Sequence, residues 1–168
     1  MDTPQIYVAC LAAYNSGYLH GRWIDAMQEV DEIYDDINDV LADSPVEDAE
    51  EWAIHDYSGF GSARIEEYES IETVVKIADF INVHGELGAT LLGEYSIDDA
   101  QCFLDDHYHG SWNSEVDFAQ SMFEDCYQNE IPDYLAGYFD FDAFSRDLFI
   151  NDYFSVEVQG QTHVFSYC

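Results

Sequence analysis

The sequence has 168 residues, of which 36 are Asp or Glu and only four are Lys or Arg, so the formal net charge is −32 at neutral pH. Because four scattered cations cannot form a basic patch, this composition excludes direct binding to DNA, RNA or an anionic membrane. The hydrophobic content of 48% and the aromatic content of 16% exclude an intrinsically disordered acidic chain, which lacks the apolar side chains needed to offset the entropy of folding.

Two strands are predicted within residues 5–26, on either side of the turn signal Asn15-Ser16-Gly17. Every second residue of the first strand is apolar and is expected to be buried, as in a pleated strand with one buried face: Ile6, Val8 and Cys10. A third strand is predicted over residues 51–57, before a loop that contains glycine. These three strands indicate an amino-terminal sheet.

A helix is predicted over residues 27–42, ending before Ser44-Pro45. Its apolar residues recur at steps of three and four and form one stripe: Val30, Ile33, Tyr34, Ile37, Val40 and Leu41. Its acids lie off this stripe: Asp31, Glu32, Asp35, Asp36, Asp39 and Asp43. No Lys or Arg lies within residues 31–51 to neutralise them, and like charges one turn apart cost about 0.2–0.5 kcal/mol per pair. On one helix alone, a solvated acidic face is the simpler interpretation.

From residue 62 the pattern becomes helical, with one apolar stripe: Ile65, Tyr68, Ile71, Val74, Val75, Ala78 and Ile81. Glycines are expected to divide the next section into short helices: Gly85, Gly88 and Gly93. Helices near 97–108 and 115–128 are predicted from two N-cap arrangements: Ser96 with Asp99, and Ser114 with Asp117. Pro132 fits the first turn of another helix, and the tail is predicted to be a hairpin that turns at Gln159-Gly160.

The predicted fold class is α+β, elongated, with small antiparallel sheets at both ends and a helical middle segment. We expect three domains: an amino-terminal α+β domain (1–61), a helical domain (62–107) and a carboxy-terminal α+β domain (108–168). The four cysteines are widely spaced without a CxxC pair, and the amino terminus lacks the features of a signal peptide. No stretch approaches the about 20 apolar residues of a membrane span. We therefore expect a reduced, cytoplasmic protein.

Acidic clusters recur after the first helix, and this recurrence favours a functional surface over a merely solvated one. The further members of the predicted surface are Glu47, Asp48, Glu50, Glu51, Glu66, Glu67, Glu69, Asp98, Asp99, Asp105, Asp106, Glu115, Asp117, Glu124 and Asp125. A compact domain of this length is about 40 Å across. Duplex DNA carries one phosphate per about 1.7 Å of axis, so the net charge of the chain resembles that of an equal length of duplex. The sequence therefore predicts a surface that imitates a nucleic-acid polyanion.

Catalytic signatures are lacking, and we expect neither an enzyme nor a cofactor. The sequence has no GxSxG motif, and Gly59 and Gly61 are followed by Arg64 where GxGxxG needs its third glycine. A P-loop is excluded because the only Lys, Lys76, does not follow a glycine loop. His107 and His109 lack a second ligand pair at typical spacing, so we expect no metal site, although weak calcium binding by Asp clusters stays open.

Several stretches resemble the ArdA antirestriction family, small acidic proteins of conjugative plasmids, transposons and prophages. They are IYVACLAAYNSGYLHGRWID near the start, EWAIHDYSGF in the middle and IPDYLAGYFDFDAFSRDLF toward the end. Their order and spacing, with the length and acidity, make the resemblance specific over most of the chain. The section from 62 to about 107 shows the least similarity.

The resemblance implies an elongated three-domain protein that forms a curved homodimer and mimics bent B-form DNA. Such a protein occupies the DNA-binding groove of type I restriction–modification enzymes, formed by their methyltransferase core, and blocks restriction and often modification. The antirestriction motif of the family, close to the dimer interface, falls on Ile131, Pro132, Tyr134, Tyr138, Phe139 and Asp140.

Two other interpretations stay open. Adaptation to high salt also produces many acids and almost no Lys, and it predicts a protein that unfolds at low ionic strength. An acidic inhibitor or chaperone of another basic DNA-binding protein would use the same physical interaction with a different partner.

Overall fold

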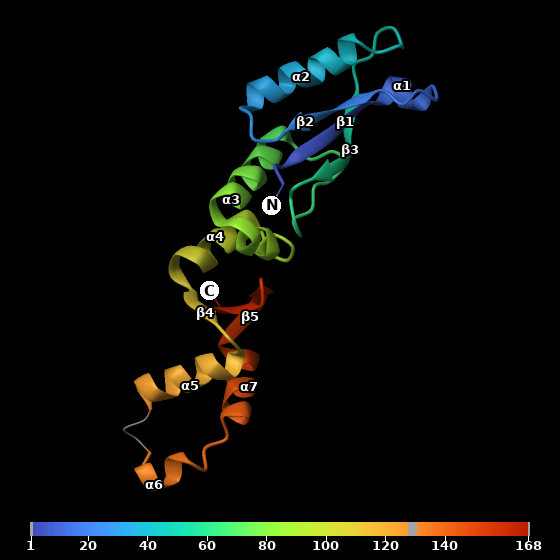
Figure 1. Ribbon diagram of the computed structural model, residues 1–168. Helices are drawn as coiled ribbons and strands as arrows, with labels where there is room; N and C mark the ends of the chain where they lie inside the picture. Colours follow the sequence, from blue (N-terminus) through green and yellow to red (C-terminus); the bar gives the residue numbers. More distant parts are fainter. Residues whose placement is uncertain (1, 128–130, 168) are drawn as a thin grey trace. The chain divides into compact units, whose positions relative to one another are not determined.

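The computed structural model describes residues 2–127 and 131–167, which divide into two compact units: unit 1, residues 1–97, and unit 2, residues 98–168. Each unit contains one three-stranded antiparallel sheet together with helices, which confirms the predicted α+β class (Figure 1). No helix among the described residues is both long enough and apolar enough to cross a membrane. The predicted borders of three domains, after residues 61 and 107, stay a prediction.

The sheet of unit 1 consists of β1 (Gln5–Cys10), β2 (Gly21–Asp25) and β3 (Trp52–Ser58) in the order β2-β1-β3. The predicted buried face of β1 is confirmed, because Ile6, Val8 and Cys10 are completely buried, but Ala9 on the other face is buried too, so the alternation of buried and accessible residues ends after Val8. The connection from β1 to β2 contains a short helix that the sequence analysis did not predict, α1 (Leu11–Asn15), followed by the turn at Ser16 and Gly17.

Helix α2 (Val30–Ala42) begins three residues later than predicted. A turn precedes it, because the Asp25 carboxylate accepts a hydrogen bond from the Met27 backbone amide at 2.9 Å. A capping box between Glu29 and Glu32 then starts the helix. The buried residues of α2 are members of the predicted apolar stripe: Ile33, Ile37 and Val40. The helix packs on β1 and β2 and against α3.

The predicted helix from residue 62 is wrong over 62–70, which forms turns and irregular backbone instead. The backbone amide of Ile54 in β3 donates to the Glu67 carbonyl at 2.9 Å, so this segment lies beside the edge of the sheet. Tyr68, assigned to the apolar stripe, is 71% exposed. Helix α3 (Ile71–Leu91) begins only after Ser70, whose hydroxyl accepts from the Thr73 amide.

Gly85 interrupts α3, as predicted, with φ 61° and ψ −144°. Gly88, in contrast, lies inside the helical section and is buried, while Gly93 follows its end. The core of unit 1 joins residues from the sheet, α2, the segment 60–65 and α3: Ile6, Val8, Ile24, Ile33, Ile37, Ile54, Phe60, Ile65, Ile71, Val74 and Ile77 are among its members.

Unit 2 contains α4 (Ile97–Asp106, whose first residue belongs to unit 1), β4 (Tyr108–Trp112), α5 (Glu115–Cys126), α6 (Asp133–Ala136), α7 (Phe141–Asn151), β5 (Tyr153–Val158) and β6 (Gln161–Ser166). Its sheet has the order β4-β6-β5. The predicted hairpin is confirmed: β5 and β6 pair, and Gln159 and Gly160 both have positive φ, as a two-residue turn of this kind requires. Ser114 caps α5 as predicted, because its hydroxyl accepts from the Asp117 amide at 3.1 Å.

Gly59 holds the loop after β3 close to the amino terminus. It has φ +82°, and a Cβ there would lie 2.5 Å from the Thr3 carbonyl oxygen. Gly17 has nearly the same φ, +83°, but a Cβ there would meet nothing within 4 Å. We expect Gly17→Ala to destabilise unit 1 by about 1–2 kcal/mol, from backbone conformation alone. Gly59→Ala should cost about 1–3 kcal/mol more, because the clash adds to the same backbone strain.

The measurement is urea unfolding of both variants followed by circular dichroism. Because the two glycines have nearly the same positive φ, the difference between the variants reports mainly on the close approach to Thr3. Equal losses of stability would contradict the assignment.

Candidate functional site

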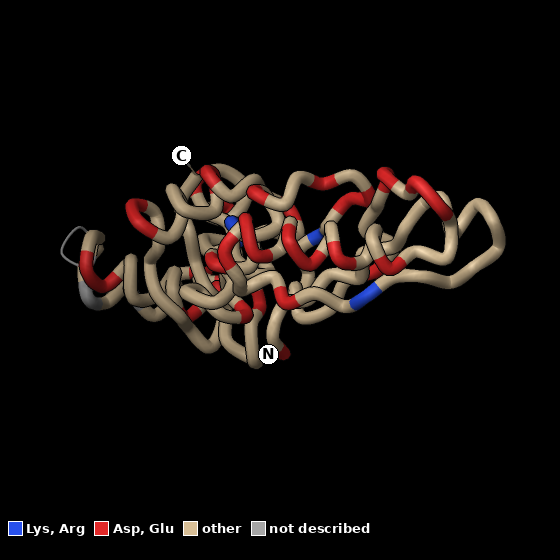
Figure 2. Tube along the Cα trace, turned by 90° about the horizontal axis from the view of Figure 1, so that it is seen from above, with Lys and Arg blue, Asp and Glu red and all other residues tan. Residues whose placement is uncertain are grey.

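Most carboxylates of the predicted acidic surface are exposed in the structure. They occur in both units and greatly outnumber the Lys and Arg residues, as the charge-coloured trace shows (Figure 2). The exceptions, which are half-buried, are Asp36, Glu69, Glu115 and Asp117. The structure therefore leaves most of the predicted acids accessible to a partner.

Helix α2 presents the most regular row of these acids. Asp31, Asp35 and Asp39 are all exposed and follow one another at steps of one turn, because the buried stripe faces the sheet. Asp31 and Glu32 lie in the first turn, where the partial positive charge of the helix amino terminus favours carboxylates. The repulsion along α2 is therefore partly offset at its start.

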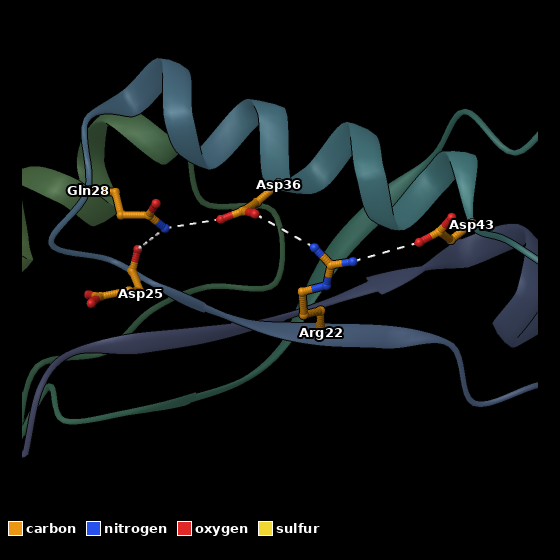
Figure 3. Close-up of polar contacts among 5 residues, drawn as sticks. All are labelled: Arg22, Asp25, Gln28, Asp36 and Asp43. Carbon is orange, nitrogen blue, oxygen red and sulfur yellow. Dashed lines mark hydrogen bonds and ion pairs between the residues drawn. The ribbon is translucent and has the colours of Figure 1, made fainter.

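Arg22 on β2 supplies a cation that the sequence analysis did not assign to this helix. Its guanidinium lies 3.7 Å from the Asp36 carboxylate and 3.8 Å from that of Asp43 (Figure 3). Arg22 pairs with the buried Val8 in the sheet and so points toward α2. The expectation that nothing neutralises this face is wrong at these two positions, because the neutralising residue comes from a neighbouring strand.

Gln28 adds a second restraint on the same carboxylate. Its side-chain amide donates to Asp36 at 3.1 Å and to the Asp25 backbone carbonyl at 3.1 Å (Figure 3). Asp36 therefore has two partners and is less available to an external cation than Asp35 or Asp39.

Two predicted surface acids in α5 have contacts inside unit 2. The Ser155 hydroxyl donates to Glu115 at 2.8 Å, and the Asn113 amide donates to Asp117 at 2.8 Å. Both carboxylates lie in the first turn of α5 and are half-buried. They connect β5 and the loop before α5 to the helix, which gives them a structural role.

The motif carried over from the family resemblance divides into outward and inward residues. Tyr134 and Tyr138 are 77% and 87% exposed, whereas the half-buried Phe139 ring lies 4.5 Å from the buried Phe123 ring. Asp140 caps α7, because its carboxylate accepts from the Ala143 amide at 3.0 Å. Ile131 is half-buried, and Pro132 occupies the cap position just before α6 rather than its first turn. Pro132 and Asp140 are exposed as well, and the two tyrosines are the large aromatic side chains of the motif that are available to a partner.

The histidines considered as metal ligands contact a shared hydroxyl. His107 Nδ1 and His109 Nε2 lie 3.0 and 3.2 Å from the Ser166 Oγ. Burial, followed by the neighbouring His107, lowers the pKa of His109. Over residues 2–127 and 131–167, no group of three or more His, Cys, Asp or Glu side chains is placed to hold a metal ion.

The acidic field also acts on two phenols, the exposed Tyr68 and the half-buried Tyr34. The carboxylate of Glu67 is the main cause of a raised pKa at Tyr68, with smaller contributions from burial and from a hydrogen bond to the same carboxylate. Tyr34 has a raised pKa because of partial burial and the nearby Glu72. These phenols stay neutral at physiological pH and serve as hydrogen-bond donors to carboxylates.

Replacement of Arg22 tests its contribution to α2. We expect Arg22→Gln to lower the free energy of unfolding by about 0.5–1 kcal/mol in 20 mM salt, because exposed ion pairs contribute little individually. In 500 mM salt the loss should shrink, since screening weakens both pairs. Urea unfolding at the two salt concentrations measures this difference.

Arg64→Gln is the matched control, because Arg64 is exposed and has no ion pair among the described residues. A loss at Arg22 that is equal in both salts, or equal to that of Arg64→Gln, would contradict an electrostatic role.

Comparison with known proteins agrees with the resemblance seen in the sequence. The model of the ArdA antirestriction protein family matches residues 6–162, which includes most of both units. No curated protein matches the sequence. The family consists of inhibitors rather than enzymes, and antirestriction implies an interaction with restriction enzymes. The matched length is well over half of the chain, and the chain therefore belongs to the ArdA family of antirestriction proteins.

Proposed function

We propose that this protein inhibits type I restriction–modification enzymes by occupying their DNA-binding groove in place of bent B-form DNA. The observation that carries this proposal is the large excess of exposed carboxylates on a surface backed by well-packed cores. The enzyme must hold DNA with Lys and Arg residues directed at phosphates. Exposed carboxylates compete for the same residues.

The charge spacing on α2 supports this mechanism. A helix rises about 6 Å over four residues, so one row of acids at steps of four is sparser than a DNA strand, with its phosphate every 3.4 Å or so. Glu32, beside Asp31, adds a second exposed acid in the first turn, so two acids there correspond to one charge per about 3 Å, close to the spacing of a single strand. Farther along the helix Asp36 is paired with Arg22, and the available charge is that of Asp35 and Asp39 alone.

Preorganisation explains how such a surface competes with DNA. The charges are already gathered by the fold, so binding does not repeat the cost of bringing them together. Long-range attraction to a basic channel also accelerates association. Because no base edges are presented, inhibition should not depend on the recognition sequence of the enzyme.

We also propose that the protein acts as a homodimer through the segment that contains Tyr134 and Tyr138. Large, exposed tyrosines at neighbouring turns are typical of interface cores, and Leu135 between them is 44% exposed. A second copy would cover these side chains and extend the acidic surface beyond one chain.

Displacement of DNA tests the inhibitory mechanism. The protein is titrated against a type I methyltransferase core bound to labelled duplex, using two enzymes with different recognition sequences. We expect displacement from both enzymes, weakened by added salt. Substitution of Asp31, Asp35 and Asp39 by Asn should weaken displacement several-fold. Its stability should be equal or higher, because three like-charge pairs of about 0.2–0.5 kcal/mol each are removed (31/35, 35/39 and 39/43), which offsets the lost interaction of Asp31 with the helix amino terminus.

The matched control replaces three exposed acids outside the predicted surface, Asp79, Asp142 and Asp147, by Asn. It changes the net charge by the same amount and should displace DNA more effectively than the α2 variant. Equal activity of both variants would remove α2 from the binding surface. Failure of the unmodified protein to displace DNA from either enzyme would refute the proposal and favour a different basic partner.

Dimer formation is tested separately by sedimentation of the variant Tyr134→Ser/Tyr138→Ser. We expect the unmodified protein to sediment as a dimer and the variant as a folded monomer, because both changed side chains are exposed within one chain. Tyr68→Ser, at a tyrosine that is 71% exposed in unit 1, is the control and should stay dimeric. A dimeric Tyr134/Tyr138 variant would place the interface elsewhere.

A further inference from the structure

An open pocket of ≈ 450 Å³ lies along β3 in unit 1. Residues from α1, β3 and the segment 61–70 line it, and these three stretches are separated in the sequence. We call it the β3 pocket, and its lining residues are Tyr14, Ile54, His55, Tyr57, Ile65 and Glu67. It therefore combines aromatic rings, two aliphatic side chains and one carboxylate.

The aromatic residues of the β3 pocket are held in place by neighbouring rings. Tyr14 and His55 meet edge to face, with centroids 4.8 Å apart and planes at 85°. Tyr57 lies in a similar arrangement against the buried Phe60, with centroids 6.0 Å apart. Tyr14 nevertheless stays 53% exposed and Tyr57 37% exposed, so both have ring surface free for a ligand.

Glu67 is the charged group of the pocket, and it has a defined position. Its backbone carbonyl accepts from the Ile54 amide of β3 at 2.9 Å, which fixes this residue beside the strand. Its carboxylate is close enough to the Tyr68 phenol to raise the pKa of that group. The described lining of the pocket contains no Lys or Arg, and the Glu67 carboxylate, which accepts from Tyr68, keeps acceptor capacity for a ligand.

A second hollow of ≈ 410 Å³ at the other end of β3 has the same chemistry. Its lining contains Trp52 and Tyr68 together with the carboxylates of Glu50 and Glu51. Aromatic rings beside carboxylates thus occur near both ends of the same strand, β3. A strand rises about 3.3 Å per residue, so the two hollows are separated by only a few residues of β3. This repetition distinguishes the edge of β3 from α2, whose exposed row contains carboxylates alone.

Aromatic faces beside a carboxylate are suited to a guanidinium group. The planar guanidinium stacks on aromatic rings and donates paired hydrogen bonds to a carboxylate, which a Lys ammonium does not match in shape. Anionic ligands are disfavoured by the net charge of −32. The chemistry of the pocket therefore selects a cationic, planar side chain.

We propose that the β3 pocket receives an arginine side chain of the partner enzyme. This inference rests on the proposed function, because a DNA-binding channel is the source of exposed guanidinium groups. The pocket adds a short-range contribution from ring stacking to the binding free energy of the complex. This contribution is less sensitive to salt than the attraction by the acidic surface, and a mimic of DNA that used charge alone would lack it.

Two variants with unchanged net charge test the inference in the displacement assay. Tyr14→Leu/Tyr57→Leu removes both ring faces, and we expect it to weaken displacement by roughly five- to thirtyfold, with most of the loss persisting at high salt. Tyr14→Phe/Tyr57→Phe keeps the rings and should displace DNA as the unmodified protein does. Tyr18→Leu is the control for removal of an exposed tyrosine, since Tyr18 is 56% exposed and does not line the pocket.

The contribution of the carboxylate is tested by a matched pair of neighbours. Glu67→Gln and Glu66→Gln each remove one charge from an exposed position, but only Glu67 lines the β3 pocket. If the partner responds only to the overall negative charge, the two variants should weaken displacement of DNA equally. If it inserts a side chain into the pocket, Glu67→Gln should weaken displacement more. Equal effects of this pair, together with full activity of the double Leu variant, would overturn the inference and leave the proposed function intact.

A direct titration separates the inference from the proposed function. The isotopically labelled full chain is titrated with N-acetyl-arginine amide, with the lysine analogue, and with the neutral citrulline analogue, and amide and ring signals are followed by NMR. We expect the arginine probe to shift the signals of Tyr14, His55 and Tyr57 more than the lysine probe, and the citrulline probe least. Equal shifts for the arginine and lysine probes, or no shift at these residues, would refute arginine recognition even if the protein displaces DNA.

Discussion

Burial of the apolar stripe of α2 is the interaction on which the acidic surface of unit 1 depends. Ile33, Ile37 and Val40 are at most 2% exposed, and complete burial of such a side chain contributes about 1.5–3 kcal/mol. Each like-charge pair on the opposite face costs only about 0.2–0.5 kcal/mol. Because burial outweighs repulsion, the apolar stripe fixes which side of the helix faces the sheet. The acids on the opposite side therefore face outward. The surface charge is thus a consequence of the core.

The remaining repulsion is reduced at the two ends of α2 by different means. At the amino terminus, Asp31 and Glu32 benefit from the partial positive charge of the helix and from the capping box. At the carboxy terminus the helix charge is unfavourable for Asp43, and there Arg22 supplies the compensating cation. The central acids, Asp35 and Asp39, lie between the amino-terminal turn and the carboxylates paired with Arg22, and both are exposed. These central positions are the most available to a basic partner.

The sequence was sufficient where local patterns decide structure. The buried face of β1, the apolar stripe of α2, the cap at Ser114 and the turn at Gln159-Gly160 involve residues near one another in the chain. It failed over 62–70, where apolar residues at helical spacing belong to an irregular segment with turns, which is hydrogen-bonded to β3 at Ile54. It also assigned no separate element to β4 or α7. A strand such as β4 is stabilised by pairing with β6, far away in the chain.

The excess of negative charge, the α+β class and the family membership follow from the sequence itself, because composition and local periodicity do not depend on which distant residues meet. Tertiary structure decided which carboxylates are paired and which aromatic rings are exposed. Arg22 reaches Asp36 only because β2 lies under α2, and Tyr138 is exposed while Phe139, its neighbour, packs on Phe123. The β3 pocket likewise exists only after α1, β3 and the segment 61–70 come together. Each of these features is a contact between residues distant in the chain, and the physical reason is that only folding sets their separation.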